Sequence, residues 1–225
     1  LVDRFATEVL SRKLAPPLHS QSLAPSLWIG RGQCLEQYGE GEAYLPMLEA
    51  LGHLCRGPKG TPVLAVLAQY APTWVVQMPA LVEGAALEAL QRKSAGATRE
   101  RMLREMADAL EALTAEQGLV LVLEDLHWSD RSTVELLAYL AQRRTLAKLL
   151  VLGTYRPVDV VVKAHPLRGI KQELDAHGQC YEVALELLTQ AEVEAYVSKR
   201  IAALPVVTEL ANLIYRRTDG NALFM

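Results

Sequence analysis

The chain has 225 residues, of which 51% are hydrophobic and 22% are charged, and its net charge at pH 7 is −3. This length buries a sizeable core without disulfides, and the composition excludes a disordered chain, which requires low hydrophobicity and high net charge. The weakly acidic balance argues against direct nucleic-acid binding by this segment, because such surfaces usually carry a basic face. The sequence has no run of about 18 apolar residues, so we expect no membrane span.

The cysteine pattern points to a reducing compartment. Cys34, Cys55 and Cys180 are odd in number and widely spaced, which is not typical of a secreted disulfide framework. We therefore interpret them as small buried apolar residues and expect a cytoplasmic protein.

The first half of the chain is predicted to be mostly helical. Apolar residues recur at helical spacing over 1–14, 43–56 and 97–117. Residues 27–35 predict a short strand between turn signals, and the proline-interrupted stretch 63–82 predicts short packed helices.

Further along, strands and helices alternate. Residues 119–123 form a continuous apolar run, which favours a strand covered on both faces in a parallel sheet, and 149–152 form a second such run. Ser132 and Glu135 have the spacing of a capping box that opens a helix. A helix over 167–177 and a short strand over 180–185 complete the alternation.

The C-terminal part is predicted to contain helices alone. Thr189 and Glu192 form another capping box, which starts a helix that runs to about residue 203, and a last helix spans about 207–217. This order of elements predicts an α/β fold with a C-terminal helical appendage. We expect the core over 1–187 and the start of a helical lid over 188–225.

Polar residues at the ends of the two apolar strands suggest a site. Glu124 and Asp125 follow the first strand, and Thr154 and Arg156 follow the second. Ligands of doubly wound sheets bind beyond the carboxyl ends of the strands, where carboxylates can hold Mg²⁺ and arginine can neutralise phosphate. The alternative is structural: an acid pair that caps a turn and an arginine that pairs with a surface acid.

These segments resemble the signal-transduction ATPases with numerous domains, P-loop NTPases of the AAA-like class found in large bacterial regulators. Residues 119–130 have the sequence LVLVLEDLHWSD and resemble the Walker B segment, and residues 153–157 resemble the sensor strand. Residues 217–224 are similar to a motif ending in Gly-Asn-Pro-Leu-Phe, and 32–46 to the strand and helix that follow the P-loop helix. The resemblance covers essentially the whole chain.

The resemblance implies roles for individual residues, with ATP and Mg²⁺ as ligands. Glu124 stands at the Walker B acid position and is expected to hold Mg²⁺ through water. Asp125 is expected to orient the hydrolytic water, and the two acids can exchange these roles, so both are metal candidates. Arg156 is expected to read the γ-phosphate with support from Thr154. His127 belongs to the motif, but its expected role is packing beneath the site.

Two departures from the family pattern concern nucleotide contacts. Gly220 and Asn221 are candidate nucleotide-binding residues, but Ala222 replaces the proline that lies against adenine in the family. An ordinary turn with Gly220 as a helix C-cap is an equal alternative.

The chain also has no Gly-x-x-x-x-Gly-Lys-[Ser/Thr] motif, whose backbone and lysine bind phosphates. By resemblance residues 1–5 match the helix after this P-loop, so we expect the first strand and the P-loop to precede residue 1.

The resemblance implies an ATP-binding, slowly hydrolysing switch in a bacterial multidomain signalling or transcriptional regulator. The expected partners are ATP and the output and sensor domains of the parent protein, with nucleotide-dependent self-association. The alternative is a non-catalytic protein-interaction module with a degenerate NTPase fold, which the missing P-loop lysine favours if the chain is complete. Without a P-loop, we expect this chain alone to bind Mg-ATP weakly and to be inactive.

Overall fold

The computed structural model describes residues 27–36, 42–58, 60–143, 147–201 and 207–224. The chain divides into two compact units, Leu1–Cys180 and Tyr181–Met225, and each is described by itself. The helix predicted over 1–14 lies outside the described residues. No helix in the described part of the chain has the length and apolar character needed to cross a bilayer.

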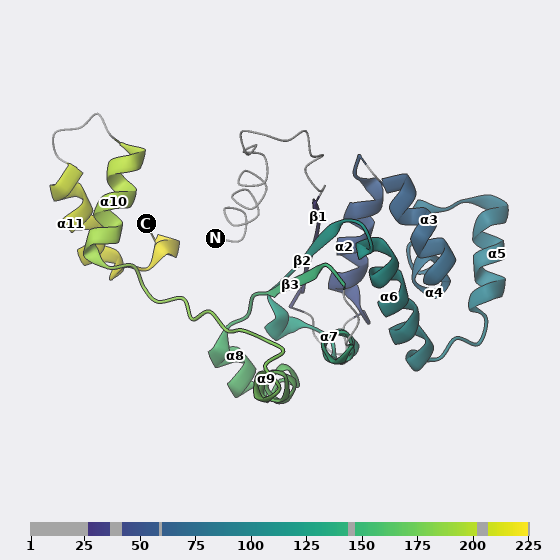
Figure 1. Ribbon diagram of the computed structural model, residues 1–225. Helices are drawn as coiled ribbons and strands as arrows, with labels where there is room; N and C mark the ends of the chain where they lie inside the picture. Colours follow the sequence, from purple (N-terminus) through teal and green to yellow (C-terminus); the bar gives the residue numbers. More distant parts are fainter. Residues whose placement is uncertain (1–26, 37–41, 59, 144–146, 202–206, 225) are drawn as a thin grey trace, which may run out of the picture. The chain divides into compact units, whose positions relative to one another are not determined.

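A three-stranded parallel sheet forms the centre of the first unit (Figure 1). Strand β2 (Gly118–Glu124) lies between β1 (Leu27–Gln33) and β3 (Leu149–Gly153). Its residues 119–123 are buried, as the continuous apolar run predicts. The α/β fold with a parallel sheet is confirmed.

Helix α2 (Leu45–Arg56) packs closely on β1 because this strand carries glycines on that face. A Cβ atom at Gly32 would lie 1.8 Å from the backbone oxygen of Pro46, so only glycine permits this approach. Met47 and Leu51 of α2 are fully buried in the resulting core.

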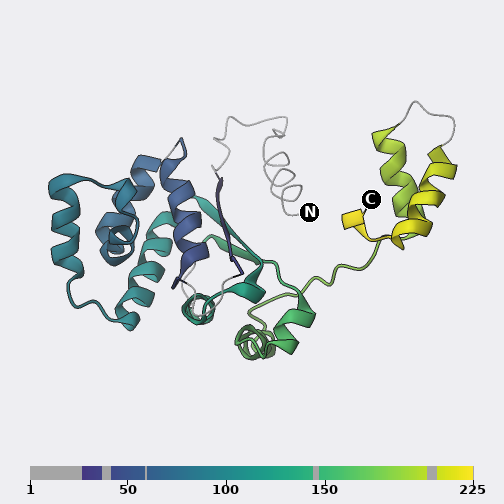
Figure 2. The same ribbon diagram turned by 180° about the vertical axis from the view of Figure 1, so that it is seen from behind.

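Further helices cover the core and extend it (Figures 1 and 2). Helices α2 and α6 lie next to the sheet, and α3, α4 and α5 lie beyond them. Helix α5 has a single buried side chain, Leu90, so the spacing of its apolar residues does not predict this helix. The bounds are α3 (Gly60–Tyr70), α4 (Pro72–Val76), η1 (Pro79–Leu81), α5 (Gly84–Ser94) and α6 (Arg99–Thr114).

Helix α7 (Arg131–Gln142) begins before the predicted capping box. Its N-cap is Asp130, whose carboxylate accepts a hydrogen bond from the Thr133 N–H at 2.9 Å. Ser132 lies inside the first turn, so the capping box that we predicted at Ser132 and Glu135 is wrong. Aspartate is as good an N-cap as serine, and it precedes Ser132 by two residues.

After β3 the first unit ends with α8 (Pro157–Val162) and α9 (Leu167–Ala176). The strand predicted over 180–185 is wrong, because residues 179–189 have no regular secondary structure. Tyr181, Val183, Leu185 and Leu187 keep the alternation of a strand, but all four are exposed and no described strand pairs with them.

The second unit is a helical pair. Helix α10 (Gln190–Arg200) starts with the predicted capping box of Thr189 and Glu192, and α11 (Val207–Thr218) packs on it through Val193, Val197 and Ala211. A 3₁₀ turn, η3 (Ala222–Phe224), follows.

Candidate functional site

The turns after β2 and β3 are joined by Thr154. Its backbone N–H donates to the Leu123 oxygen (3.0 Å), and its backbone oxygen accepts from the Leu126 N–H (2.8 Å). Its hydroxyl oxygen accepts from the Asp125 N–H at 3.0 Å. Three hydrogen bonds from one residue therefore hold the two strand ends together.

Asp125 adopts an unusual backbone conformation at this edge. Its φ of 58° and ψ of 41° lie in the left-handed region, which costs energy for a residue with a side chain. The hydrogen bonds of Thr154 hold the turn in place. One carboxylate oxygen of Asp125 accepts from the Gln33 amide of β1 at 3.2 Å, so all three strand ends contribute to this site.

Glu124 has different surroundings from its neighbour. It is the last residue of β2, it pairs in register with Gln33, and its side chain is half-buried. It borders a shallow hollow together with Glu49 and His53 of α2. The two adjacent acids thus both lie at the sheet edge beside Gln33, but only Glu124 borders this hollow.

Arg156 lies against the turn after β2. The Cζ atom of its guanidinium is 5.9 Å from the centroid of the Trp128 ring, which is a cation–π distance. Its backbone N–H donates to Nδ1 of His127 at 3.4 Å. The structure therefore brings Asp125, Thr154 and Arg156 to neighbouring turns of one edge.

His127 is fully buried beside this arginine. Its Nε2 lies 3.5 Å from a carboxylate oxygen of Asp159 in the first turn of α8, and its ring lies 4.5 Å from that of Trp128. Burial lowers the pKa of the imidazole, and the carboxylates of Asp125 and Asp159 oppose this shift without reversing it. The ring is therefore neutral at pH 7.

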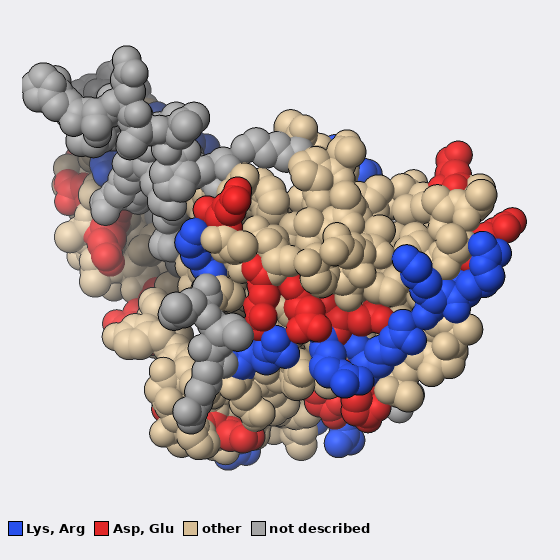
Figure 3. Space-filling view, turned by 45° about the vertical axis from the view of Figure 1, so that its right-hand side comes forward, with Lys and Arg blue, Asp and Glu red and all other residues tan. Residues whose placement is uncertain are grey.

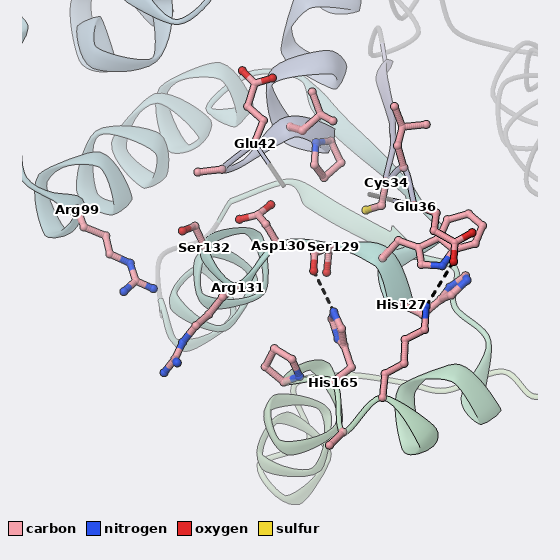
Figure 4. A pocket seen from close by; sticks show the side chains of 18 residues that line it. Cys34, Glu36, Glu42, Arg99, His127, Ser129, Asp130, Arg131, Ser132 and His165 are labelled. Carbon is pink, nitrogen blue, oxygen red and sulfur yellow. Dashed lines mark hydrogen bonds and ion pairs between the residues drawn. The ribbon is translucent and has the colours of Figure 1, made fainter. Parts of the chain in front are cut away.

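A cavity of about 940 Å³ opens next to this edge, at the end of β1, the start of α7 and the α8–α9 turn (Figure 4). Lys163 faces Glu36 at 3.6 Å, and Nε2 of His165 is 2.9 Å from the Ser129 oxygen. The volume is in the range of small-ligand pockets. His127 lines the cavity, whereas none of the predicted catalytic, metal or nucleotide residues does.

Cys34 also lines the cavity, but it is not a reactive thiol. Its side chain is buried, and burial, with the charges of Asp130, Asp125 and Glu49, raises its pKa to about 12. A protonated thiol is a poor nucleophile. Cys34 is thus the buried residue that we predicted, whereas Cys55 and Cys180 are half-buried free cysteines.

Charged side chains of α6 and α7 form several ion pairs. Arg143 at the end of α7 contacts Glu111 at 2.6 Å and Asp108 at 3.1 Å, and Arg131 contacts Glu135 at 3.0 Å. Acidic and basic groups lie side by side on the face shown in Figure 3. On that face a continuous band of basic side chains runs beside a row of acidic side chains (Figure 3).

Gly220 and Asn221 belong to the second unit and not to the unit with the strand ends. Gly220 has a φ of 76° and follows α11, and its oxygen accepts from the Leu188 N–H at 2.8 Å. The Asn221 side chain accepts from the Leu223 N–H at 3.0 Å. Both residues thus have structural roles in the turn after α11.

The acids of the first unit suit magnesium in their chemistry. The described residues contain no group of three or more His, Cys, Asp or Glu that could hold a metal ion. Mg²⁺ often takes only one or two carboxylates and fills its remaining positions with water and phosphate oxygens. Glu124 and Asp125 can supply such carboxylates.

Sequence reasoning missed two residues of this region. Asp130 accepts hydrogen bonds from the starts of both α2 and α7, through the Tyr44 N–H (3.1 Å) and the Thr133 N–H. His127, expected only to pack, contacts Arg156 and Asp159. Both lie in the segment that suggests the site, but their partners are remote in sequence.

Comparison with known proteins agrees with this architecture. A family model described as the AAA ATPase domain matches residues 9–152, which include β1, β2 and most of β3. No curated protein and no solved structure shows significant similarity to the chain. Since the family match spans more than half of the sequence, the chain belongs to the AAA ATPase domain family.

Proposed function

We propose that the chain is the ATP-binding and slowly hydrolysing regulatory domain of a bacterial multidomain signalling or transcriptional regulator. Glu124 would hold Mg²⁺, Asp125 would orient the attacking water, and Arg156 with Thr154 would contact the γ-phosphate. Mg²⁺ would supply charge neutralisation at the phosphates. In this proposal residues 1–187 are the core and 188–225 the start of a lid, where Gly220 and Asn221 would approach the base.

The observation that carries the proposal is the junction at the carboxyl edge of the sheet. The Asp125 N–H donates to the Thr154 hydroxyl, and the Arg156 guanidinium lies over Trp128 in the same pair of turns. An acid and an arginine at neighbouring strand ends can act on a polyphosphate together. Membership of the AAA ATPase domain family supports nucleotide as the ligand.

The regulatory context rests on the family resemblance of the segments 32–46, 119–130, 153–157 and 217–224. It comprises output and sensor domains as partners, nucleotide-dependent self-association and a cytoplasmic location. We propose these as properties of the protein in which this domain acts.

A second candidate function is a protein-interaction module that does not hydrolyse ATP. One observation favours it if the chain is complete: these 225 residues contain no Gly-Lys dipeptide, and hence no phosphate-binding loop of the usual type. For the same reason we predict that the 225-residue chain binds Mg-ATP weakly. Micromolar binding by calorimetry would contradict this prediction.

The deciding experiment measures Mg-ATP binding and hydrolysis by the natural gene product that contains these residues. We expect binding and slow turnover. Asp125→Asn should lower kcat by about 100-fold or more while retaining most of the affinity, because a group that positions or deprotonates the nucleophile contributes about that factor. Glu124→Gln should weaken binding as well as turnover.

The matched control is Glu88→Gln, at an exposed position of α5 whose carboxylate contacts only Arg92 at 3.8 Å. This variant should keep the parental kcat. Parental turnover in both acid variants would refute the site assignment. Absence of Mg-ATP binding by the gene product would refute the switch and leave the interaction module.

A further inference from the structure

The dipeptide His127-Trp128 contacts Arg156 from two sides. The Trp128 ring lies under the guanidinium at 5.9 Å, and Nδ1 of His127 accepts from the Arg156 backbone N–H at 3.4 Å. The two rings are also in contact, with centroids 4.5 Å apart. Both ends of the arginine, backbone and guanidinium, are therefore held by one short turn.

The hydrogen bond to Nδ1 determines the form of the ring. A nitrogen that accepts a hydrogen bond carries no proton, so the neutral imidazole carries its proton on Nε2. This N–H lies 3.5 Å from Asp159, is buried, and has no better-placed acceptor among the described residues. In this form Nδ1 faces the Arg156 N–H after β3, and Nε2 faces Asp159 at the start of α8.

Three contacts thus join the turn after β2 to the segment 154–159. Thr154 binds the backbone on both sides of the turn, His127 binds Arg156, and the same ring faces Asp159. Thr154 is close to the strand ends, where the sheet already restrains the backbone. Arg156 and Asp159 lie beyond the sheet, where His127 and Trp128 tie Arg156, and His127 faces Asp159, from the turn after β2.

We propose that His127 is a positioning residue that fixes Arg156, and with it the start of α8, to the turn that carries Asp125. The proposal rests on the proposed function in one respect, namely that Arg156 contacts the γ-phosphate. A residue that only fills space needs the right volume, whereas this role needs an acceptor at Nδ1 and a donor at Nε2. Replacements that keep one of these two groups distinguish the two roles.

Asparagine and glutamine separate the two halves of the ring. Asparagine carries its oxygen at the position of Nδ1, so His127→Asn retains an acceptor for the Arg156 N–H and loses the contact to Asp159. Glutamine carries its amide at the position of Nε2, so His127→Gln retains a donor for Asp159 and loses the acceptor. Asp159→Asn removes the charge that faces Nε2.

The first test is amide hydrogen exchange of the 225-residue chain without nucleotide. We expect the Arg156 amide to exchange roughly fivefold faster in His127→Gln, the loss that corresponds to one net hydrogen bond. His127→Asn should keep the parental rate. His177→Asn is the control, because this exposed histidine follows the last residue of α9 and its Nδ1 lies 2.7 Å from the Glu173 oxygen of that helix. Equal protection of Arg156 in the parent and in His127→Gln would overturn the proposal.

A second measurement needs no variant and applies even if both substitutions prevent folding. Long-range ¹H–¹⁵N correlation spectra of the labelled parent report which ring nitrogen carries the proton. We expect the Nε2–H form for His127. The Nδ1–H form would overturn the proposal, because that nitrogen could not then accept from Arg156.

A third measurement connects the residue to catalysis in the natural gene product. His127→Gln should lower kcat for ATP with little change in KM, and His127→Asn should restore most of it. If the gene product does not hydrolyse ATP, the proposed function fails, while the nucleotide-free exchange and tautomer results still decide the role of His127. If it does and His127→Gln keeps the parental kcat, the positioning role is refuted.

Discussion

Replacing Asp130 should destabilise the first unit more than any other substitution of a half-exposed acid near the site. Its carboxylate accepts from the Thr133 N–H at 2.9 Å and from the Tyr44 N–H at 3.1 Å. These bonds cap α7 and fix the residue before α2. Asp130→Ala removes both, together with the bond that Asp130 accepts from the Thr133 hydroxyl, whereas Asp130→Asn keeps an oxygen for the Thr133 N–H and turns an amide group toward Tyr44.

The magnitude follows from the two contacts. Loss of an N-cap costs about 1 kcal/mol. Tyr44 is buried, so water cannot replace the lost partner of its N–H, and an unpaired buried donor costs about 1–3 kcal/mol. We expect a loss of about 2–4 kcal/mol for Asp130→Ala and about 1–3 kcal/mol for Asp130→Asn.

Urea unfolding followed by tryptophan fluorescence measures this loss of stability in the first unit of the chain. The three tryptophans, Trp28, Trp74 and Trp128, all belong to the unit Leu1–Cys180. Asp108→Ala is the control, because this half-exposed carboxylate pairs with Arg143 on the surface and such pairs contribute about 0–1 kcal/mol. A loss below about 0.5 kcal/mol for Asp130→Ala, or a larger loss for Asp130→Asn than for Asp130→Ala, would refute the reasoning.

Two further predictions concern the second unit and pH. Gly220→Ala should destabilise the unit Tyr181–Met225 by about 2 kcal/mol or more, because φ is 76° and a Cβ would lie 1.9 Å from the Leu188 oxygen. Thermal unfolding measures this loss of stability. A loss no larger than that of Gly178→Ala, where φ is 65° and the space is open, would contradict the prediction. Since burial lowers the pKa of His127 in the folded chain, the unfolded chain binds more protons near pH 6. The contribution of the neutral His127 ring to the free energy of unfolding is therefore fully present above about pH 6.5 and is lost as the pH falls through the pKa of His127 in the folded chain. The free energy of unfolding, measured with urea between pH 5 and 8, should depend less steeply on pH in His127→Gln than in the parent. An unchanged pH dependence would exclude a buried neutral ring at His127.

Sequence reasoning found the sheet and its polar edge because both depend on local signals. The run 119–123 is buried on both faces of the sheet and is apolar throughout, and its end is marked by the change to Glu124 and Asp125. Parallel strands place their carboxyl ends at the same edge. The proximity of Thr154 to Asp125 then follows from the fold class alone.

The errors arose where two local patterns compete, or where a local pattern needs a distant partner. Ser132 and Glu135 have capping-box spacing, but Asp130 starts α7 two residues earlier, where it also reaches Tyr44. The alternation over 180–185 is a strand pattern, yet a strand needs a neighbour, and the described sheet provides none. The missing neighbour decided the strand, whereas the start of α7 was decided by the bond from the Thr133 N–H to Asp130, a second local N-cap signal that the spacing of Ser132 and Glu135 concealed.

The segment 119–130 combines two kinds of residue, and this combination indicates how the site is organised. His127 and Asp130 use their polar atoms on other elements of the fold, namely Arg156 and Asp159 for the former and the starts of α2 and α7 for the latter. Within the described part of the chain, the Asp125 carboxylate accepts one side-chain hydrogen bond, from Gln33, and the residue is held through its backbone by Thr154. Because its position does not depend on its carboxylate, that carboxylate can bind a ligand without loosening the turn. Substitutions of Asp125 should therefore affect chemistry more than stability, and substitutions of Asp130 the reverse.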